Sequence, residues 1–275
     1  MSEDKWSKEQ IFEGDAEVYG TAYKFKKSKI PVGKKRRVAF PLIFVIMFAL
    51  ICATTSGVVS GIVSVTNGTS SESLKLTSKN YYAVNTGSFS SVELATDVAG
   101  RIKELGGAGY VYNHNGEYNV LLYVYKLQDD AITVSQKVTE QGFTTNIISF
   151  DCKEKVYKYN LSSEDISIFS TALKSFDQVY ERLYEISNDY DNKITTLSAS
   201  RLELVEVQKQ FERDYSAFLT TFSNTKDENI INLIRKLDIV SSELDILVDP
   251  LMLDSNFASL IKHSCINVVI ARYEL

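Results

Sequence analysis

The sequence predicts an α+β protein with one transmembrane helix, a small β-α-β-β-α-β domain and an all-α C-terminal region. Residues 38–71 hold no charged side chain, as expected of a membrane span. Short apolar strand patterns then alternate with helical patterns as far as Gly142. All 13 glycines lie at or before that residue, so the rest of the chain has few residues that interrupt helices. The expected divisions are residues 1–37, 38–65, 66–79, 80–152 and 162–275.

The uncharged run predicts a single-pass protein of the cell membrane. A helix needs about 20 apolar residues to cross a bilayer, and the run at residues 38–65 is long enough. Residues 24–37, just before it, carry eight basic and no acidic side chains. Because basic residues beside a span stay on the cytoplasmic side, we expect a cytoplasmic, disordered segment at residues 1–37. The Ser/Thr-rich residues 66–79 are expected to be an extracytoplasmic linker.

Charge and composition restrict the partners and cofactors that we expect. The first 37 residues hold ten Lys/Arg against six Asp/Glu, which leaves 20 against 29 for the rest. An acidic body argues against a nucleic-acid partner, whose phosphates require a basic surface. Cys152 and Cys265 can pair only if the fold brings them together, and we expect free thiols. With two histidines and no zinc-ligand spacing, we expect no metal and no other cofactor.

Strand, helix and turn signals define the small domain. Asn115-Gly116 is a turn signal, because both residues tolerate positive φ. Ser90 and Glu93 form a capping box for the first helix. The order is that of a ferredoxin-like domain, a four-stranded antiparallel sheet with both helices on one face and the other face bare. The expected strands are residues 81–86, 110–112, 117–125 and 143–150, and the expected helices are residues 91–105 and 129–141.

Several motifs in this order resemble the SPOR (sporulation-related) domain of bacterial cell-envelope proteins. They are Gly87-Ser88-Phe89, Tyr118-Asn119-Val120 and Gly142-Phe143, and the resemblance covers residues 80–150. It implies a SPOR-like domain that binds peptidoglycan glycan strands, especially strands stripped of stem peptides, across the bare sheet face. It also implies a role in cell division, sporulation or remodelling of the cell envelope.

The resemblance and the strand pattern together indicate a glycan-binding set. Asn119 stands where the family usually has Arg, and Tyr123 replaces a usual Gly. Amides suit sugar hydroxyls and aromatic rings suit sugar C–H faces. In the alternative interpretation, the tyrosines of this strand fill a sheet that the C-terminal helices cover. The expected glycan-binding residues are Asn85, Ser88, Asn119, Leu121 and Tyr123.

The C-terminal region shows a heptad pattern typical of a coiled coil or helical bundle. Apolar residues follow the pattern from Ile166 to Phe222 and again from Ile230 to Leu247. A helix over residues 163–223 would extend about 90 Å, with a bend near residues 187–192. We favour an antiparallel hairpin or three-helix bundle over a parallel dimer, because the seam is rich in bulky Phe and Tyr.

These features predict a non-enzymatic envelope protein that binds peptidoglycan through its sheet. Its helices would associate with a second copy or with another envelope protein. The alternative is a structural or assembly protein whose α+β domain contacts proteins rather than glycan. We expect no enzyme, because glycan hydrolysis needs two positioned carboxylates and Glu117 is the only carboxylate on the expected sheet face.

Overall fold

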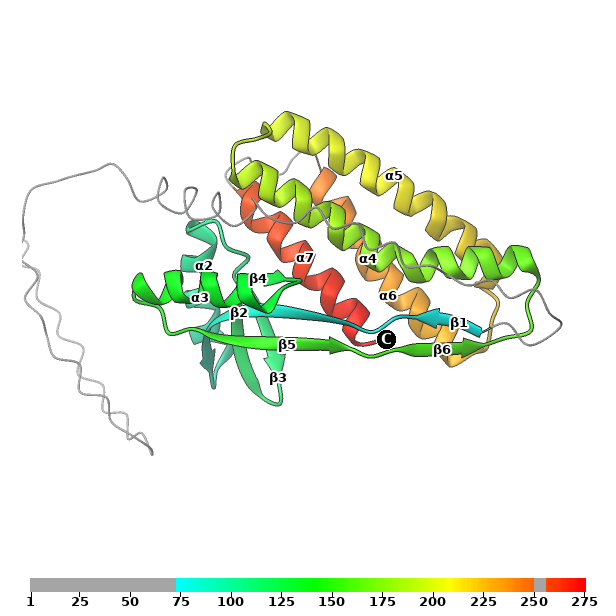
Figure 1. Ribbon diagram of the computed structural model, residues 1–275, viewed down its shortest axis with the longest axis horizontal. Helices are drawn as coiled ribbons and strands as arrows, with labels where there is room; N and C mark the ends of the chain where they lie inside the picture. Colours follow the sequence, from blue (N-terminus) through cyan, green and yellow to red (C-terminus); the bar gives the residue numbers. More distant parts are fainter. Residues whose placement is uncertain (1–72, 250–255) are drawn as a thin grey trace, which may run out of the picture. The chain divides into compact units, whose positions relative to one another are not determined.

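The computed structural model describes residues 73–249 and 256–275, which form an α+β fold (Figure 1). The strands are β1 (Ser73–Leu76), β2 (Lys79–Phe89), β3 (Tyr110–His114), β4 (Glu117–Tyr125), β5 (Asn146–Cys152) and β6 (Lys155–Lys158). The helices are α2 (Val92–Glu104), α3 (Gln128–Glu140), α4 (Ser163–Asp191), α5 (Leu197–Phe222), α6 (Glu228–Val248) and α7 (Phe257–Tyr273).

The transmembrane helix of the expected fold is not supported by the structure. Within residues 73–249 and 256–275, no helix is both long enough and apolar enough to cross a bilayer. Helix α4, with 29 residues, has the length but carries charged side chains on its exposed positions. The segment on which the span was expected, residues 38–65, and the expected cytoplasmic segment, residues 1–37, lie outside the described residues.

The larger sheet has four antiparallel strands in the order β3-β4-β2-β5. Helices α2 and α3 follow β2 and β4 and pack against the same two central strands. The turn expected between β3 and β4 forms at Asn115 and Gly116, whose φ angles are 54° and 86°. Two positive φ angles match the twist of the flanking strands, which explains the choice of Asn-Gly. Helix α2 is capped by Ser91 instead of Ser90, since the Ser91 hydroxyl accepts from the Leu94 amide.

A second, two-stranded sheet corrects the prediction of a linker at residues 66–79. Strand β1 pairs with β6 in antiparallel register, and β2 begins directly after it at Lys79. Leu74 and Leu76 are buried on either side of the exposed Lys75, which is the alternation of a half-buried strand. Figure 1 shows that β1 and β6 continue from β2 and β5 alongside the helical bundle.

The four C-terminal helices form an antiparallel bundle within one chain. Helix α4 contacts α5 and α7, and α6 contacts the same two helices. The expected long helix ends at Asp191 and a new helix starts at Leu197. Lys193, with φ of 58°, follows the cap residue Asn192, so the chain reverses where the sequence predicted only a bend. Ile194, expected at the seam, is 71% exposed as a result.

Lys193→Gly should raise the free energy of unfolding by about 0.5–1 kcal/mol, because glycine adopts positive φ without the Cβ clash that lysine meets. Urea denaturation of the full chain provides the measurement. Lys174→Gly is the matched control, since Lys174 is exposed within α4 and the same change there costs about 1 kcal/mol. A Lys193→Gly chain that is less stable than wild type would contradict the assignment of the helix end.

Candidate functional site

Both faces of the four-stranded sheet are covered at the central strand β4, whereas the edge strands β3 and β5 keep half-buried and exposed residues. Every residue of β4 from position 119 to position 125 is buried. Because successive side chains of a strand point to opposite faces, an unbroken run of buried residues requires packing layers on both sides. Leu122 lies against Ile102 and Gly107 at the end of α2, whereas the neighbouring Tyr123 contacts the helical bundle. The bare sheet face expected from the sequence is therefore absent from the described fold.

Helix α7 forms most of the second covering layer. It packs on β4 and β5, and on α4 and α6 at its other sides. The Tyr123 hydroxyl lies 3.8 Å from the sulfur of Cys265. The ring of Tyr110 contacts His263, with centroids 4.8 Å apart. An aromatic side chain of α4, Tyr184, stacks on Tyr123 with centroids 5.6 Å apart. The tyrosines of this sheet thus meet helices, as the alternative interpretation of the sequence stated.

The five expected glycan-binding residues are placed as follows. Leu121 and Tyr123 have no exposed surface, Asn85 has none, and Asn119 is 6% exposed. Only Ser88 is exposed. The prediction that these residues form an open carbohydrate-binding face is wrong for four of the five, because their side chains are buried. At Tyr123, α7 and α4 occupy the space that a glycan would need. Peptidoglycan binding itself stays a prediction.

Three of these residues do come together, but in a network within the protein. The amide nitrogen of Asn85 lies 3.0 Å from the Ser88 hydroxyl, 3.1 Å from Asn119 Oδ1 and 2.8 Å from Asn146 Oδ1. The Ser88 hydroxyl also donates to Asn119 Oδ1 at 2.7 Å. The network lies where the register of β2 and β4 shifts. Since an interrupted strand pair leaves polar groups without ladder partners, these side chains stabilise the irregularity.

A buried ion pair fixes the end of α7. Arg272 Nε donates to Asp177 Oδ1 of α4 at 2.6 Å, and Arg272 Nη2 donates to the carbonyl of Thr77 at 2.7 Å. Lys79 Nζ lies 2.9 Å from the other oxygen of Asp177, and the Tyr81 hydroxyl also donates to this carboxylate, at 3.2 Å. Asp177 therefore joins α7, α4 and the start of β2 at one point.

A second set of buried polar groups holds the middle of α7. Lys262 Nζ lies 2.6 Å from Asp191 at the end of α4 and donates to the carbonyl of Gly106 at 2.7 Å. Burial raises the pKa of Asp191, and the nearby Lys262 charge opposes that rise. On the side of α6, Glu243 accepts from Ser264 at 2.7 Å and from Asn267 at 2.6 Å.

Burial shifts the pKa values of the titratable groups where α7 packs on the sheet. Desolvation raises the pKa of Tyr123 well above its ordinary value and raises the pKa of Cys265 to about 12. Cys152 and Cys265 are both buried free thiols. No group of three or more His, Cys, Asp or Glu side chains suited to a metal ion occurs within residues 73–249 and 256–275.

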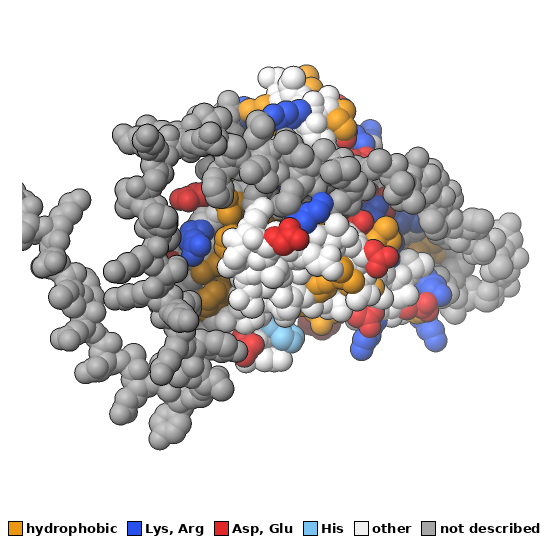
Figure 2. All heavy atoms as spheres, turned by 60° about the vertical axis from the view of Figure 1, so that its left-hand side comes forward, with side chains coloured by type: hydrophobic (Ala, Val, Ile, Leu, Met, Phe, Trp, Pro, Cys, Tyr) orange, Lys and Arg blue, Asp and Glu red, His pale blue; other side chains and the backbone are white. Residues whose placement is uncertain are grey.

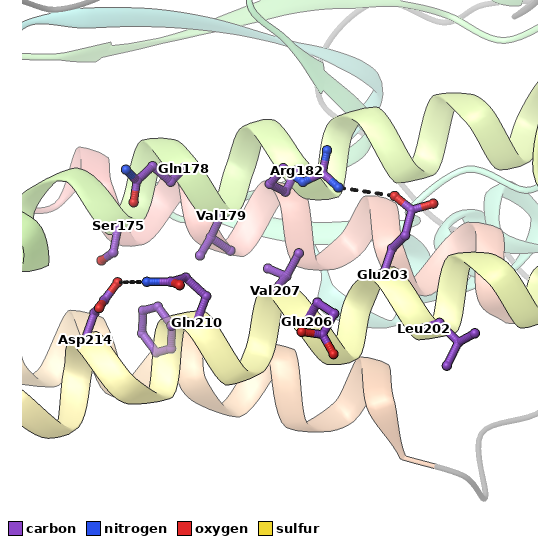
Figure 3. Close-up of a pocket in the computed structure, with 11 residues that line it drawn as sticks. Ser175, Gln178, Val179, Arg182, Leu202, Glu203, Glu206, Val207, Gln210 and Asp214 are labelled. Carbon is purple, nitrogen blue, oxygen red and sulfur yellow. Dashed lines mark hydrogen bonds and ion pairs between the residues drawn. The ribbon is translucent and has the colours of Figure 1, made fainter.

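A groove with a volume of about 520 Å³ lies between α4 and α5 (Figure 3). Val179, Val207 and Phe211 form its apolar floor, and each is at most 9% exposed. Leu202, which is 70% exposed, and Asp214 mark the two ends of its α5 side in Figure 3. The α5 side therefore covers three turns of helix, about 18 Å.

Polar side chains form the rim of this groove. Arg182 Nη2 donates to Glu203 at 3.2 Å, and Gln210 donates to Asp214 at 2.7 Å. The groove was not predicted from the sequence, because the heptad pattern marks only the seam between helices. The available signal was the apolar residues beside that seam, namely Val179, Leu202 and Val207.

Charged side chains are mixed on the face of the molecule shown in Figure 2. Acidic and basic groups are interspersed with apolar ones across the described part of this face. Such mixing gives no extended field of one sign there. The chain matches no protein-family model, no curated protein and no solved structure. The resemblance to the SPOR domain therefore stays a prediction from the sequence.

Asp177→Ala should lower the free energy of unfolding by about 3–5 kcal/mol, because it leaves the Arg272 guanidinium, 1% exposed, without its carboxylate. Glu154→Ala is the control, since the Lys75–Glu154 pair is 51% and 47% exposed, and it should cost less than about 1 kcal/mol. Urea denaturation measures both. Equal losses in the two variants would show that the buried pair does not hold α7.

His263→Gln should weaken the dependence of stability on pH below about pH 6.5. Burial is the largest cause that lowers the pKa of His263, Lys103 lowers it further, and Glu243 and a backbone bond at Ala108 oppose the shift. A histidine with a lowered folded pKa binds its proton more tightly in the unfolded chain. Stability is therefore present above the ordinary pKa of about 6.5 and falls as pH drops below it.

The measurement is the free energy of unfolding of the wild-type and variant chains between about pH 8 and pH 5. The difference between wild type and His263→Gln should shrink as the pH falls. His114→Gln, which leaves His263 in place, should keep the wild-type slope. Parallel curves for wild type and His263→Gln would rule out this histidine as the source.

Proposed function

We propose that this protein is a non-enzymatic assembly protein, which binds another protein through the groove between α4 and α5. The groove is the observation that carries the proposal. It combines an apolar floor with a polar rim on the outside of the bundle, and this is the composition of sites that accept a protein segment. The proposal follows the alternative interpretation of the sequence, in which the fold contacts proteins instead of glycan.

The arrangement of the sheet supports this choice. An assembly protein needs a rigid body and a surface patch, whereas a sheet that binds glycan needs one open face. Helices α2 and α3 pack on β2 and β4, and α7 packs on β4 and β5. The sheet therefore serves as the core of the body, and its aromatic side chains stabilise the fold.

The exposed apolar side chain at one end of the groove gives further support. Leu202 is 70% exposed although it belongs to a regular helix. Single exposed apolar residues are common on protein surfaces. Here the residue lies at the rim of the groove whose floor Val207 and Phe211 form, so it can add apolar contact to a segment bound there.

Site-specific photo-crosslinking in cells that make the protein tests this function. A photoreactive phenylalanine analogue at Leu202 should form an adduct with one defined protein, identified by mass spectrometry. The same analogue at Leu94, which is 55% exposed on α2, is the control and should not form that adduct. Leu202→Glu should then reduce recovery of the identified protein with the full chain by about tenfold or more, since a charge enters an apolar contact.

Two results would overturn the proposal. One is the absence of a specific adduct at Leu202. The other is retention of the full chain on purified cell-wall sacculi that survives salt and is lost in Asn85→Ala. That result would favour the carbohydrate interpretation over protein binding.

A further inference from the structure

We infer that the α4/α5 groove accepts a basic amphipathic helix from a partner protein, an apolar stripe flanked by Lys or Arg. This inference rests on the proposed function and specifies the chemistry of the partner. It follows from the shape of the groove, from the charges on its rim and from the charge of the chain itself.

The shape of the groove favours a helix as the occupant. The groove runs along two neighbouring antiparallel helices, which place α-helical ridges on both of its sides. Val207 and Phe211 are four residues apart on α5, so their side chains stand one turn apart along the floor. A partner helix places apolar residues at the same interval, and its three turns would match the length of the α5 side.

The rim is acidic. The charged residues that line the groove are Glu203, Glu206 and Asp214 against the single base Arg182. Two of these carboxylates already have basic neighbours: Arg182 lies 3.2 Å from Glu203, as well as 2.6 Å from Glu185, and Lys209 lies 3.0 Å from Glu206. Asp214 accepts from a neutral amide, that of Gln210. The lining still holds two more carboxylates than bases. Because exposed ion pairs contribute little, basic groups on the partner can compete with Arg182 and Lys209 for the carboxylates on the α5 side of the groove.

A second copy of this chain fits this rim poorly. Residues 38–275 hold 20 basic against 29 acidic side chains. A surface with this balance brings more negative charge to a rim that is already negative, and like charges facing each other across an interface oppose association.

The chain's own basic segment, residues 24–37, also fits poorly. It supplies eight positive charges, but Pro31 interrupts it and its apolar residues are limited to a few positions around Phe25 and Ile30. Proline in a helix interior removes a backbone hydrogen bond and clashes with the preceding turn. This sequence does not supply a three-turn apolar stripe, so the occupant is a segment of another protein.

Synthetic peptides test the inference on the full chain. The probe is a helical peptide of about 18 residues, roughly 27 Å long, with leucine at i, i+3, i+4 and i+7 and lysine beside this stripe. A matched peptide carries glutamate at the lysine positions, and a third carries the lysines with the leucines scrambled. Fluorescence anisotropy measures binding. We expect the lysine peptide to bind at least about tenfold more tightly than either of the others.

Variants of the rim place the binding in the groove. Glu206→Lys should weaken binding of the lysine peptide about tenfold and strengthen binding of the glutamate peptide, since the local charge is reversed. Glu212→Lys is the matched control. It makes the same charge change at an exposed position of α5 outside the groove, and it should alter neither affinity by more than about twofold. Circular dichroism confirms that both variants keep the helical fold.

Each of the following outcomes overturns the inference, and each shows which part of it is wrong. Equal binding of the lysine and glutamate peptides, or equal effects of Glu206→Lys and Glu212→Lys, removes the role of rim charge. Self-association of the chain that the lysine peptide reverses identifies a second copy as the occupant. Tighter peptide binding after removal of residues 1–37 identifies the chain's own segment. A specific adduct at Leu202 without lysine preference would leave the proposed function intact, whereas loss of the adduct refutes both.

Discussion

The structure depends on the enclosure of α7, a helix whose apolar residues are not confined to one face. Twelve of its 17 residues are buried, including Lys262 and Arg272. A helix that is buried on most of its sides is stable in water only when other elements surround it. The sheet covers one side of α7, and α4 and α6 cover the others. This requirement joins the sheet and the bundle into one body, and it explains why the sheet has no open face.

The buried charges on α7 fix the rotation and the position of this helix among its neighbours. Apolar packing alone would permit a helix to rotate or slide, since burial of apolar surface is non-directional. The pairs that Lys262 forms with Asp191 and Arg272 forms with Asp177 are each 2.6 Å long and lie on different parts of the helix. Because removal of one partner of a buried pair is costly, the middle and the C-terminal end of α7 keep one register against α4. The rigid α4 that results is also one wall of the groove.

Local signals in the sequence predicted most of the helices and strands, because each depends on neighbouring residues. Asn115-Gly116 predicted the hairpin, and the heptad residues of α6 from Ile230 to Leu247 are all buried. The chain reversal at Lys193 was predicted only as a bend near residues 187–192, because neither glycine nor proline marks it. Strand β1 was missed because four residues with two leucines give a weak signal until β6 supplies the partner.

The covered sheet face could not be predicted from any single segment. Alternation in β4 predicted two faces but not what would lie against each. The evidence was in α7, whose apolar residues recur without the period of an amphipathic helix. To predict that α7 covers the sheet, the whole chain must be considered together. Tyr123, expected from its strand alone to contact a ligand, fills the core once α7 is taken into account.

The position of α7 in the chain also bears on how the protein is made. Every element that α7 contacts precedes it, and about 100 residues separate the end of β5 from its first turn. Ribosomes add about 5–20 residues per second, so the aromatic side of the completed sheet stays uncovered for about 5–20 s. Over that interval the ring of Tyr110 lacks its partner His263, which belongs to α7. The part of the sheet that α7 covers is therefore the last part of the fold to be buried during synthesis.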